Sequence, residues 1–200
     1  LLLIGTSTLI TAHATGTSKL GYGDFSPIAS IFNDFVVVAV YAASPLKSGK
    51  DLVAVLRSDA QSLPLGFASS LGNHHHIIAG LLMKNIGANP RDLKTVIFKG
   101  SSLALTALLG SHIELVSTGA GNAAPHLEAG KLRVLGVSSG QCLPGTMAVV
   151  PTWKEQGVDL VFANWRGIVA APDLSDKQKQ ELVDLIKKMH DSQQWKDAVA

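Results

Sequence analysis

The stretch that most constrains how this chain can fold is residues 66–84, GFASSLGNHHHIIAGLLMK. An apolar approach ends in a small polar loop at residues 69–73, and an apolar helical pattern begins at Ile77. A strand, a short loop and a helix start in this order place backbone N–H groups and the positive end of a helix dipole at one point. The stretch therefore predicts capture of a carboxylate or another small oxyanion.

The predicted loop also carries polar side chains. Its serines and Asn73 supply hydrogen-bond donors, and Asn73 is the expected N-cap of the helix. Such residues before a helix can instead serve only to satisfy the loop backbone and cap the helix, so both interpretations stay open. The candidate ligand contacts in this stretch are Ser69, Ser70, Gly72, Asn73 and His74.

Three consecutive histidines, residues 74–76, open the helix. Successive helical positions point about 100° apart, so the three rings cannot share one metal ion, and no HExxH motif is present. We expect no metal site, and we expect His76 to be a packed or hydrogen-bonded structural residue. His74 or His75 could carry positive charge toward a carboxylate at mildly acidic pH. Without a Rossmann or Walker A glycine motif, no nucleotide cofactor is predicted.

The composition is that of a globular chain with an ample core. Apolar residues make up 46% of the 200 residues and charged residues 16%. The net charge is +2 and the lysines and arginines are scattered, so no basic stripe suggests a nucleic-acid partner. The single Cys142 excludes an internal disulfide. No run approaches the roughly 20 apolar residues that a membrane helix needs.

Strands and helices alternate along the chain, which predicts an α/β fold with mostly parallel sheets. The run FVVVAVY is apolar at every position and is expected to be buried on both faces. A serine and an aspartate at positions 48 and 51 resemble a capping box at a helix start. Expected strands cover residues 1–4, 25–32, 35–41, 63–67, 95–98, 112–117, 132–137, 158–163 and 165–171, and expected helices begin near residues 48, 74, 100, 122, 151, 175 and 192. Residues 5–23 are expected to form a loop or a weak helix around residues 7–13.

Small polar loops recur where predicted strands end, at residues 5–7, 69–73 and 118–122. In open α/β sheets ligands bind at the carboxyl ends of strands, so convergence of three such loops would form one polar pocket. Glycines in these loops can instead serve turn conformation. The further candidate ligand contacts are Thr6, Ser7, Thr118 and Gly119.

Five segments occur in an order and spacing that resemble one known family. They are HHHIIAGLLMK, KGSSLALTALLGSHIELV, PHLEAGKLRVLGVSS, VPTWKEQGVDL and ANWRGIVAAPDLS. Together they resemble the substrate-binding proteins of tripartite tricarboxylate transporters, the Bug family, over essentially the whole chain. The Asn-Trp-Arg-Gly stretch at residues 164–167 looks most like the tricarboxylate-binding branch.

The resemblance implies a two-lobed type II periplasmic binding protein fold, with a ligand cleft between two mostly parallel sheets. Lobe one would hold residues 1–41 and 165–200, and lobe two residues 42–164. Strands near Tyr41 and Asn164 would join the lobes, and closure would be a hinge motion. The implied function is non-enzymatic: a periplasmic monomer captures a small organic acid, a di- or tricarboxylate, and hands it to membrane transporter subunits.

The resemblance also implies which residues contact the ligand. In the family the loop before a helix grips the carboxylate, which matches residues 69–74 here, and Thr118, Gly119 and the turn at residues 5–7 also face the cleft. Trp165 is a further candidate contact, although tryptophan after a strand break also suits hinge packing. A glycine-rich loop of the family would lie upstream of Leu1, so an N-terminal segment is expected to be absent from this chain.

Two other functions stay open from the sequence. The effector-sensing domain of a LysR-type transcription regulator shares the two-lobed fold. An α/β hydrolase-like enzyme could pair Ser69 with His74, although no GxSxG elbow and no orienting acid are indicated. The preferred prediction is the solute-binding protein, with backbone N–H groups and hydroxyls capturing carboxylate oxygens.

Overall fold

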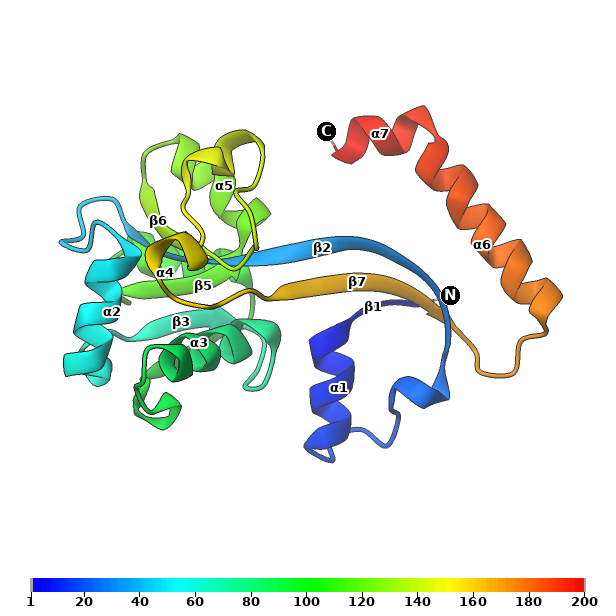
Figure 1. The fold of residues 1–200 in the computed structure, drawn as a ribbon, viewed down its shortest axis with the longest axis horizontal. Coiled ribbons are helices and arrows are strands. Elements are labelled where there is room, and N and C mark those ends of the chain that lie inside the picture. Colours follow the sequence, from blue (N-terminus) through cyan, green and yellow to red (C-terminus); the bar gives the residue numbers. More distant parts are fainter. Residues whose placement is uncertain (1, 200) are drawn as a thin grey trace. The chain divides into compact units, whose positions relative to one another are not determined.

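The computed structural model describes the backbone of residues 2–199 and the side chains of residues 9–197 (Figure 1). The chain forms two compact units. The central unit is Asp34–Asn164, and the terminal unit combines Leu1–Asn33 with Trp165–Ala200.

The central unit is built on a sheet in the order β4-β3-β5-β2-β6. Strand β3 pairs in parallel with β4 and β5, whereas β2 pairs antiparallel with β5 and β6. Strands β3 to β6 therefore run in one direction and β2 runs against them, which confirms a mostly parallel α/β sheet. The strands are β2 (Ser26–Tyr41), β3 (Leu65–Ala68), β4 (Thr95–Phe98), β5 (Leu115–Gly119) and β6 (Leu132–Val137).

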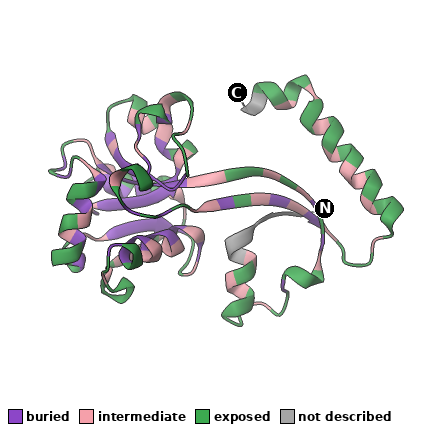
Figure 2. Cartoon of the chain, in the orientation of Figure 1, coloured by how far each residue is buried: buried purple, intermediate pink, exposed green. Residues whose placement is uncertain are grey.

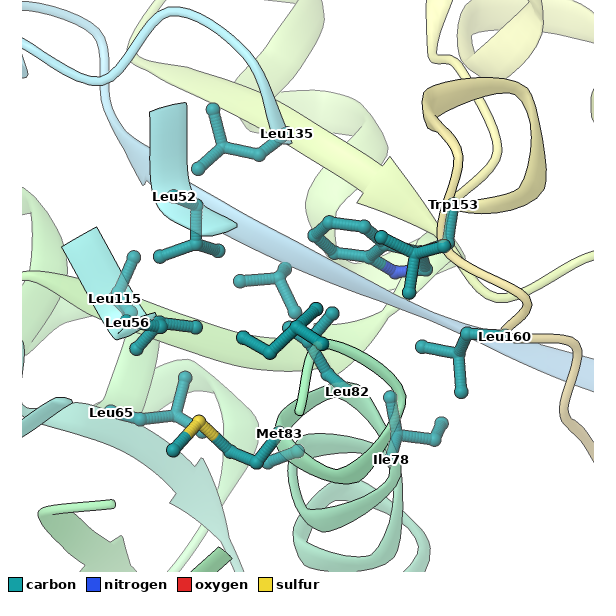
Figure 3. Close-up of a cluster of buried hydrophobic side chains, with 14 of the residues drawn as sticks. Leu52, Leu56, Leu65, Ile78, Leu82, Met83, Leu115, Leu135, Trp153 and Leu160 are labelled. Carbon is teal, nitrogen blue, oxygen red and sulfur yellow. The ribbon is translucent and has the colours of Figure 1, made fainter. Parts of the chain in front are cut away.

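Two apolar cores lie on the opposite faces of this sheet. The first packs α2 (Gly49–Ser58) and α3 (His74–Asn85) against the strands, and Figure 3 shows Ile78, Leu82 and Met83 of α3 among its members. The second packs α4 (Ser101–Leu109) and α5 (Ala120–Glu128). Strand β2 contributes side chains to both cores, because successive side chains of a strand point to opposite faces. Val36, Val38 and Val40 belong to the first core, and Val37 and Ala39 to the second.

The buried residues of the central unit gather in its strands (Figure 2). The predicted burial of residues 35–41 on both faces is confirmed for Val36 to Val40, which are at most 2% exposed. The predicted capping box is also confirmed, because Ser48 Oγ accepts from Asp51 N–H and Asp51 Oδ2 accepts from Ser48 N–H. Short 3-10 helices complete the connections: η1 (Tyr22–Asp24), η2 (Ala60–Ser62), η3 (Pro90–Asp92), η4 (Gly145–Val149) and η5 (Lys154–Gln156).

The terminal unit contains three α-helices in the described part of the chain. Strand β1 (Leu2–Gly5) pairs antiparallel with β7 (Ala163–Ala170), with Leu3 opposite Ile168. β7 in turn neighbours the first part of β2 in the sheet order. The helices are α1 (Thr6–Ala14), α6 (Asp176–Asp191) and α7 (Gln193–Val199).

Some predicted elements differ from the structure. The separate strands expected at residues 25–32 and 35–41 form one strand, β2, because Asn33 and Asp34 continue the extended backbone. The compact units accordingly divide inside β2 rather than at Tyr41, and again between Asn164 and Trp165. Residues 158–162, expected as a strand, belong to no helix or strand. The division into ligand-closing lobes stays a prediction.

Candidate functional site

The candidate loop, residues 69–73, connects the end of β3 to the start of α3. Ser69 has a φ of 80°, as does Gly72, so the chain turns twice through the left-handed region within this short loop. Ser69 N–H donates to Phe98 O at 2.9 Å, which ties the loop to the end of β4. The predicted sequence of strand, small-residue loop and helix is confirmed.

Asn73 is the N-cap of α3, as predicted. Its Oδ1 accepts from His76 N–H at 3.1 Å, and its Nδ2 donates to Ala68 O. The side chain is 5% exposed. Both polar atoms of the Asn73 side chain are therefore engaged inside the chain, joining the end of β3 to the first turn of α3.

The hydroxyl groups of Ser69 and Ser70 are placed differently. Both side chains are exposed, and within residues 9–197 neither hydroxyl has a hydrogen-bond partner. No acidic residue lies in the first turn of α3. The loop thus presents two hydroxyl donors beside a helix N-terminus whose partial positive charge is not neutralised by a carboxylate of that turn.

The three histidines of α3 have three environments. His75 is 5% exposed, and its Nδ1 lies 3.5 Å from Ser117 Oγ. The ring of His74 lies 4.0 Å from that of His75, centroid to centroid. His76 Nδ1 accepts from Gly72 N–H at 3.0 Å, and its ring stacks on Phe67. The prediction that His76 is a packed, hydrogen-bonded residue is confirmed. Among the residues described, no three His, Cys, Asp or Glu side chains form a group that could hold a metal ion.

The end of β5 lies beside the end of β3, because Phe67 pairs with Ser117. Thr118 is 1% exposed, and its Oγ1 has no hydrogen-bond partner in the described part of the chain. The loop predicted at residues 118–122 is wrong: β5 extends to Gly119 and α5 starts at Ala120 without an intervening loop. The parallel strands thus bring the two predicted groups, residues 69–74 and 118–119, to one edge of the central sheet.

Sequence reasoning missed two polar neighbours of Gly119. A β-carbon at this position would lie 3.1 Å from Asp34 Oδ1 and 3.5 Å from Asn122 Nδ2. Asp34 therefore places a carboxylate at the start of α5. The signal was present, since a charged residue between two apolar strand patterns is unusual for a buried strand.

The remaining predicted contacts belong to the terminal unit. Thr6 and Ser7 begin α1 directly after β1, so the expected turn at residues 5–7 is a helix start. Their side chains lie outside the described residues. Trp165 lies on β7 and is 39% exposed, and its ring covers Gly167, where a β-carbon would lie 2.7 Å from Trp165 Cζ3.

The terminal unit has two hollows. One, of about 440 Å³, is lined by apolar groups together with the carboxylate-bearing Asp24. The other, of about 200 Å³, lies between β2 and α6 and is lined by apolar side chains together with Ser30, Lys187 and His190. Neither is lined by residues of the candidate loop. No helix in the described chain combines the length and apolar character needed to cross a membrane.

Sequence comparison covers nearly the entire chain. Residues 2–200 match a family model described as "Tripartite tricarboxylate transporter family receptor". The chain is 31% identical, over 188 residues, to the "UPF0065 protein in gbd 5'region" of Cupriavidus necator, which covers 92% of this chain and 55% of that protein. The chain spans about half the length of the curated relatives that it matches.

Comparison with solved structures also finds proteins of this kind. A TctC solute-binding protein from Polaromonas, solved without ligand, superimposes with a TM-score of 0.80 at 25% identity, covering 98% of this chain and 66% of that one. R. palustris Rpa4515, solved with adipate, gives a TM-score of 0.73 at 25% identity, covering 86% of this chain and 56% of that one. The fold of this chain is therefore that of TctC periplasmic binding proteins.

Proposed function

This chain belongs to the tripartite tricarboxylate transporter receptor family, and we propose that it captures a small di- or tricarboxylate outside the cytoplasm for a transporter of this kind. The observation that carries the proposal is the pair of exposed, unpartnered hydroxyls of Ser69 and Ser70 beside the start of α3, within the described chain. The adipate bound to R. palustris Rpa4515 supports a carboxylate ligand.

The proposed mechanism is capture by hydrogen bonds without a permanent counter-charge. The hydroxyls of Ser69 and Ser70 donate to one ligand carboxylate, while the N-terminus of α3 supplies partial positive charge. Such charge-assisted hydrogen bonds are stronger than those between neutral groups. His74, at the first position of α3, is proposed as a third contact. Gly72 and Asn73 hold the loop in the required conformation.

Thr118 and Gly119 are proposed to serve the same ligand from the neighbouring strand. The buried, unpartnered Thr118 Oγ1 supports this assignment, since a buried hydroxyl without a partner is costly unless a ligand or water completes it. Thr6, Ser7 and Trp165 stay predicted contacts from the terminal unit. The proposed setting is a periplasmic, non-enzymatic monomer that delivers its ligand to membrane transporter subunits. The family match favours this role over the regulator domain and the hydrolase.

A thermal-shift screen tests the proposal. The protein is heated with citrate, tricarballylate, malate, adipate and acidic amino acids, because a ligand that binds the folded state raises the melting temperature. The test variant is Ser69→Gly with Ser70→Ala, where glycine suits the positive φ of residue 69. Ser58→Ala with Ser62→Ala is the matched control, since both serines are exposed and bond only to the backbone of their own helical turns.

The expected result is a rise with one class of acid that the control keeps and the test variant loses. A melting temperature that no acid raises would contradict the proposal. A rise that survives in the test variant would place the ligand elsewhere in the chain.

A further inference from the structure

His76 connects the candidate loop, strand β3 and the first turn of α3. Its Nδ1 accepts from Gly72 N–H in the loop at 3.0 Å. Its own backbone N–H donates to the Asn73 cap at 3.1 Å. Its ring stacks on Phe67 of β3, with centroids 5.5 Å apart and planes 19° apart. The imidazole therefore links the loop to the sheet and to the first turn of α3 at once.

The bond to Gly72 depends on the charge of the ring. An imidazole nitrogen accepts a hydrogen bond only when it carries no proton, and both nitrogens become donors in the imidazolium form. A proton on Nδ1 would therefore set an N–H against the Gly72 N–H. The left-handed turn at Gly72, with a φ of 80°, would lose the bond that fixes it.

We propose that His76 is the positioning residue of the carboxylate-binding loop: its neutral imidazole holds Gly72 in place, and protonation of Nδ1 releases the loop and weakens ligand capture. The effect on ligand capture rests on the proposed function, but the bond between Gly72 and His76 is present in the structure without a ligand. It assigns a proton-sensitive role to a side chain that touches the loop and not the ligand.

The surroundings of His76 favour this role. β3 (LGFA) and β5 (LVSTG), both in contact with α3, carry no ionisable side chain. The short helix η3 also contacts α3 and brings Arg91 and Asp92, which follow the C-terminal end of α3. Further ionisable groups are His74, His75 and Lys84 on α3 itself and the exposed Lys99 that follows β4. From α2, Arg57 Nε donates to Ile86 O at the C-terminal end of α3, the end opposite to His76.

Burial alone lowers the pKa of His76 below its ordinary value of 6.5. The bond from Gly72 N–H to His76 Nδ1 is therefore kept at neutral pH and is lost only in acid. This direction is opposite to that of a histidine that contacts the ligand, because an imidazolium ion at the ligand would strengthen carboxylate binding as the pH falls.

The first test needs no ligand. In a ¹⁵N-labelled sample, the Gly72 amide and the His76 ring resonances are followed by NMR from pH 7.5 to pH 4.5. The two are expected to titrate with the same midpoint. In His76→Asn, where the amide oxygen replaces Nδ1 as acceptor, the Gly72 resonance is expected to stay constant. In His76→Phe, which keeps the ring but lacks the acceptor, it is expected to resemble the acid form of the unsubstituted protein.

The matched control is His112→Asn, because His112 is exposed and lies outside the loop. A Gly72 resonance that ignores the His76 titration would overturn the proposal. Loss of the resonance of the buried Trp153 indole would show that His76→Phe does not fold. In that case, comparison of the Gly72 titration in the unsubstituted protein and in His76→Asn still tests the proposal.

The second test uses the acid that gives the largest thermal shift. Calorimetry is expected to show weaker binding as the pH falls through the His76 titration, and His76→Asn is expected to remove this dependence. At neutral pH, His76→Phe is expected to bind about fivefold more weakly, as for the loss of one hydrogen bond. Unchanged affinity across the titration would overturn the positioning role. If no acid binds at all, the proposed function fails, but the titration of the Gly72 amide still tests whether His76 holds the loop through its bond to Gly72.

Discussion

The carboxylate of Asp34 lies against Gly119 at the start of α5, where a β-carbon on residue 119 would come within 3.1 Å of Asp34 Oδ1. A side chain at residue 119 would therefore push the carboxylate away by a few tenths of an ångström, and the negative charge of Asp34 sits at the positive end of the α5 dipole. Three helices start at this edge of the sheet: α3 and α4 have no acidic residue in their first turns, whereas the start of α5 faces a carboxylate.

This relationship predicts the effect of Asp34→Asn. Removing the charge is expected to strengthen binding of the ligand acid severalfold at low salt, with the gain shrinking as salt screens the interaction. Calorimetry at two salt concentrations measures it, and Asp173→Asn, at an exposed aspartate, serves as the control. Weaker binding to Asp34→Asn would mean that Asp34 supports the site rather than limiting it.

The partial burial of His76 predicts a change of stability with pH. Burial lowers the pKa of His76, so the unfolded chain takes up the proton near pH 6.5, before the folded chain does. Stability that is fully present above pH 6.5 is therefore lost as the pH falls toward the folded pKa. Urea unfolding between pH 7.5 and pH 5 is expected to show a steeper loss for the unsubstituted protein than for His76→Asn. Parallel curves for the two proteins would contradict this.

Two glycines of the central unit predict opposite effects of alanine. A β-carbon at Gly136 would lie 2.8 Å from the ring of the fully buried Trp153, so Gly136→Ala is expected to destabilise by about 1–3 kcal/mol. A β-carbon at Gly80, inside α3, meets no atom within 4 Å. Gly80→Ala is expected to stabilise by up to about 1 kcal/mol through helix propensity. Denaturant unfolding of both variants measures the pair, and equal effects would refute the steric explanation.

Glu155 predicts how reactive the thiol of Cys142 is. The hydrogen bond from Cys142 Sγ to Glu155, 3.5 Å long, raises the pKa of the exposed thiol, so less thiolate is present near neutral pH. Glu155→Gln is expected to speed the reaction with an aromatic disulfide reagent at pH 8. Glu181→Gln, on α6, provides the comparison. An unchanged rate in Glu155→Gln would show that the carboxylate does not control this thiol.

The local elements were predictable where the pattern and the caps agreed. The capping box of Ser48 and Asp51, the Asn73 cap, and the strands at residues 95–98 and 132–137 follow from side-chain chemistry within a few positions. The family resemblance then supplied what local patterns lack, namely how these elements assemble.

Other features could not be predicted because they depend on residues far apart in the sequence. Asn33 and Asp34 are typical of a break between strands, yet the single strand β2 continues through them. Thr118 and Gly119 read as loop residues, yet pairing with Val37 and Val36 of β2 holds both in β5. The contact between Asp34 and Gly119 follows from that pairing; the charged residue between two apolar strand patterns is a local signal, but it does not identify Gly119 as the neighbour.

The alternation of β2 between two cores also limits how this segment can change during evolution. Within residues 36–40, losing or gaining one amino acid would turn every later side chain to the opposite face. Because residues 36–40 are all valine or alanine, such a shift would keep the strand apolar, but it would move each side chain from one of the two cores to the other. Substitutions among small apolar residues should therefore be common here among related sequences, while insertions and deletions should be confined to the turns.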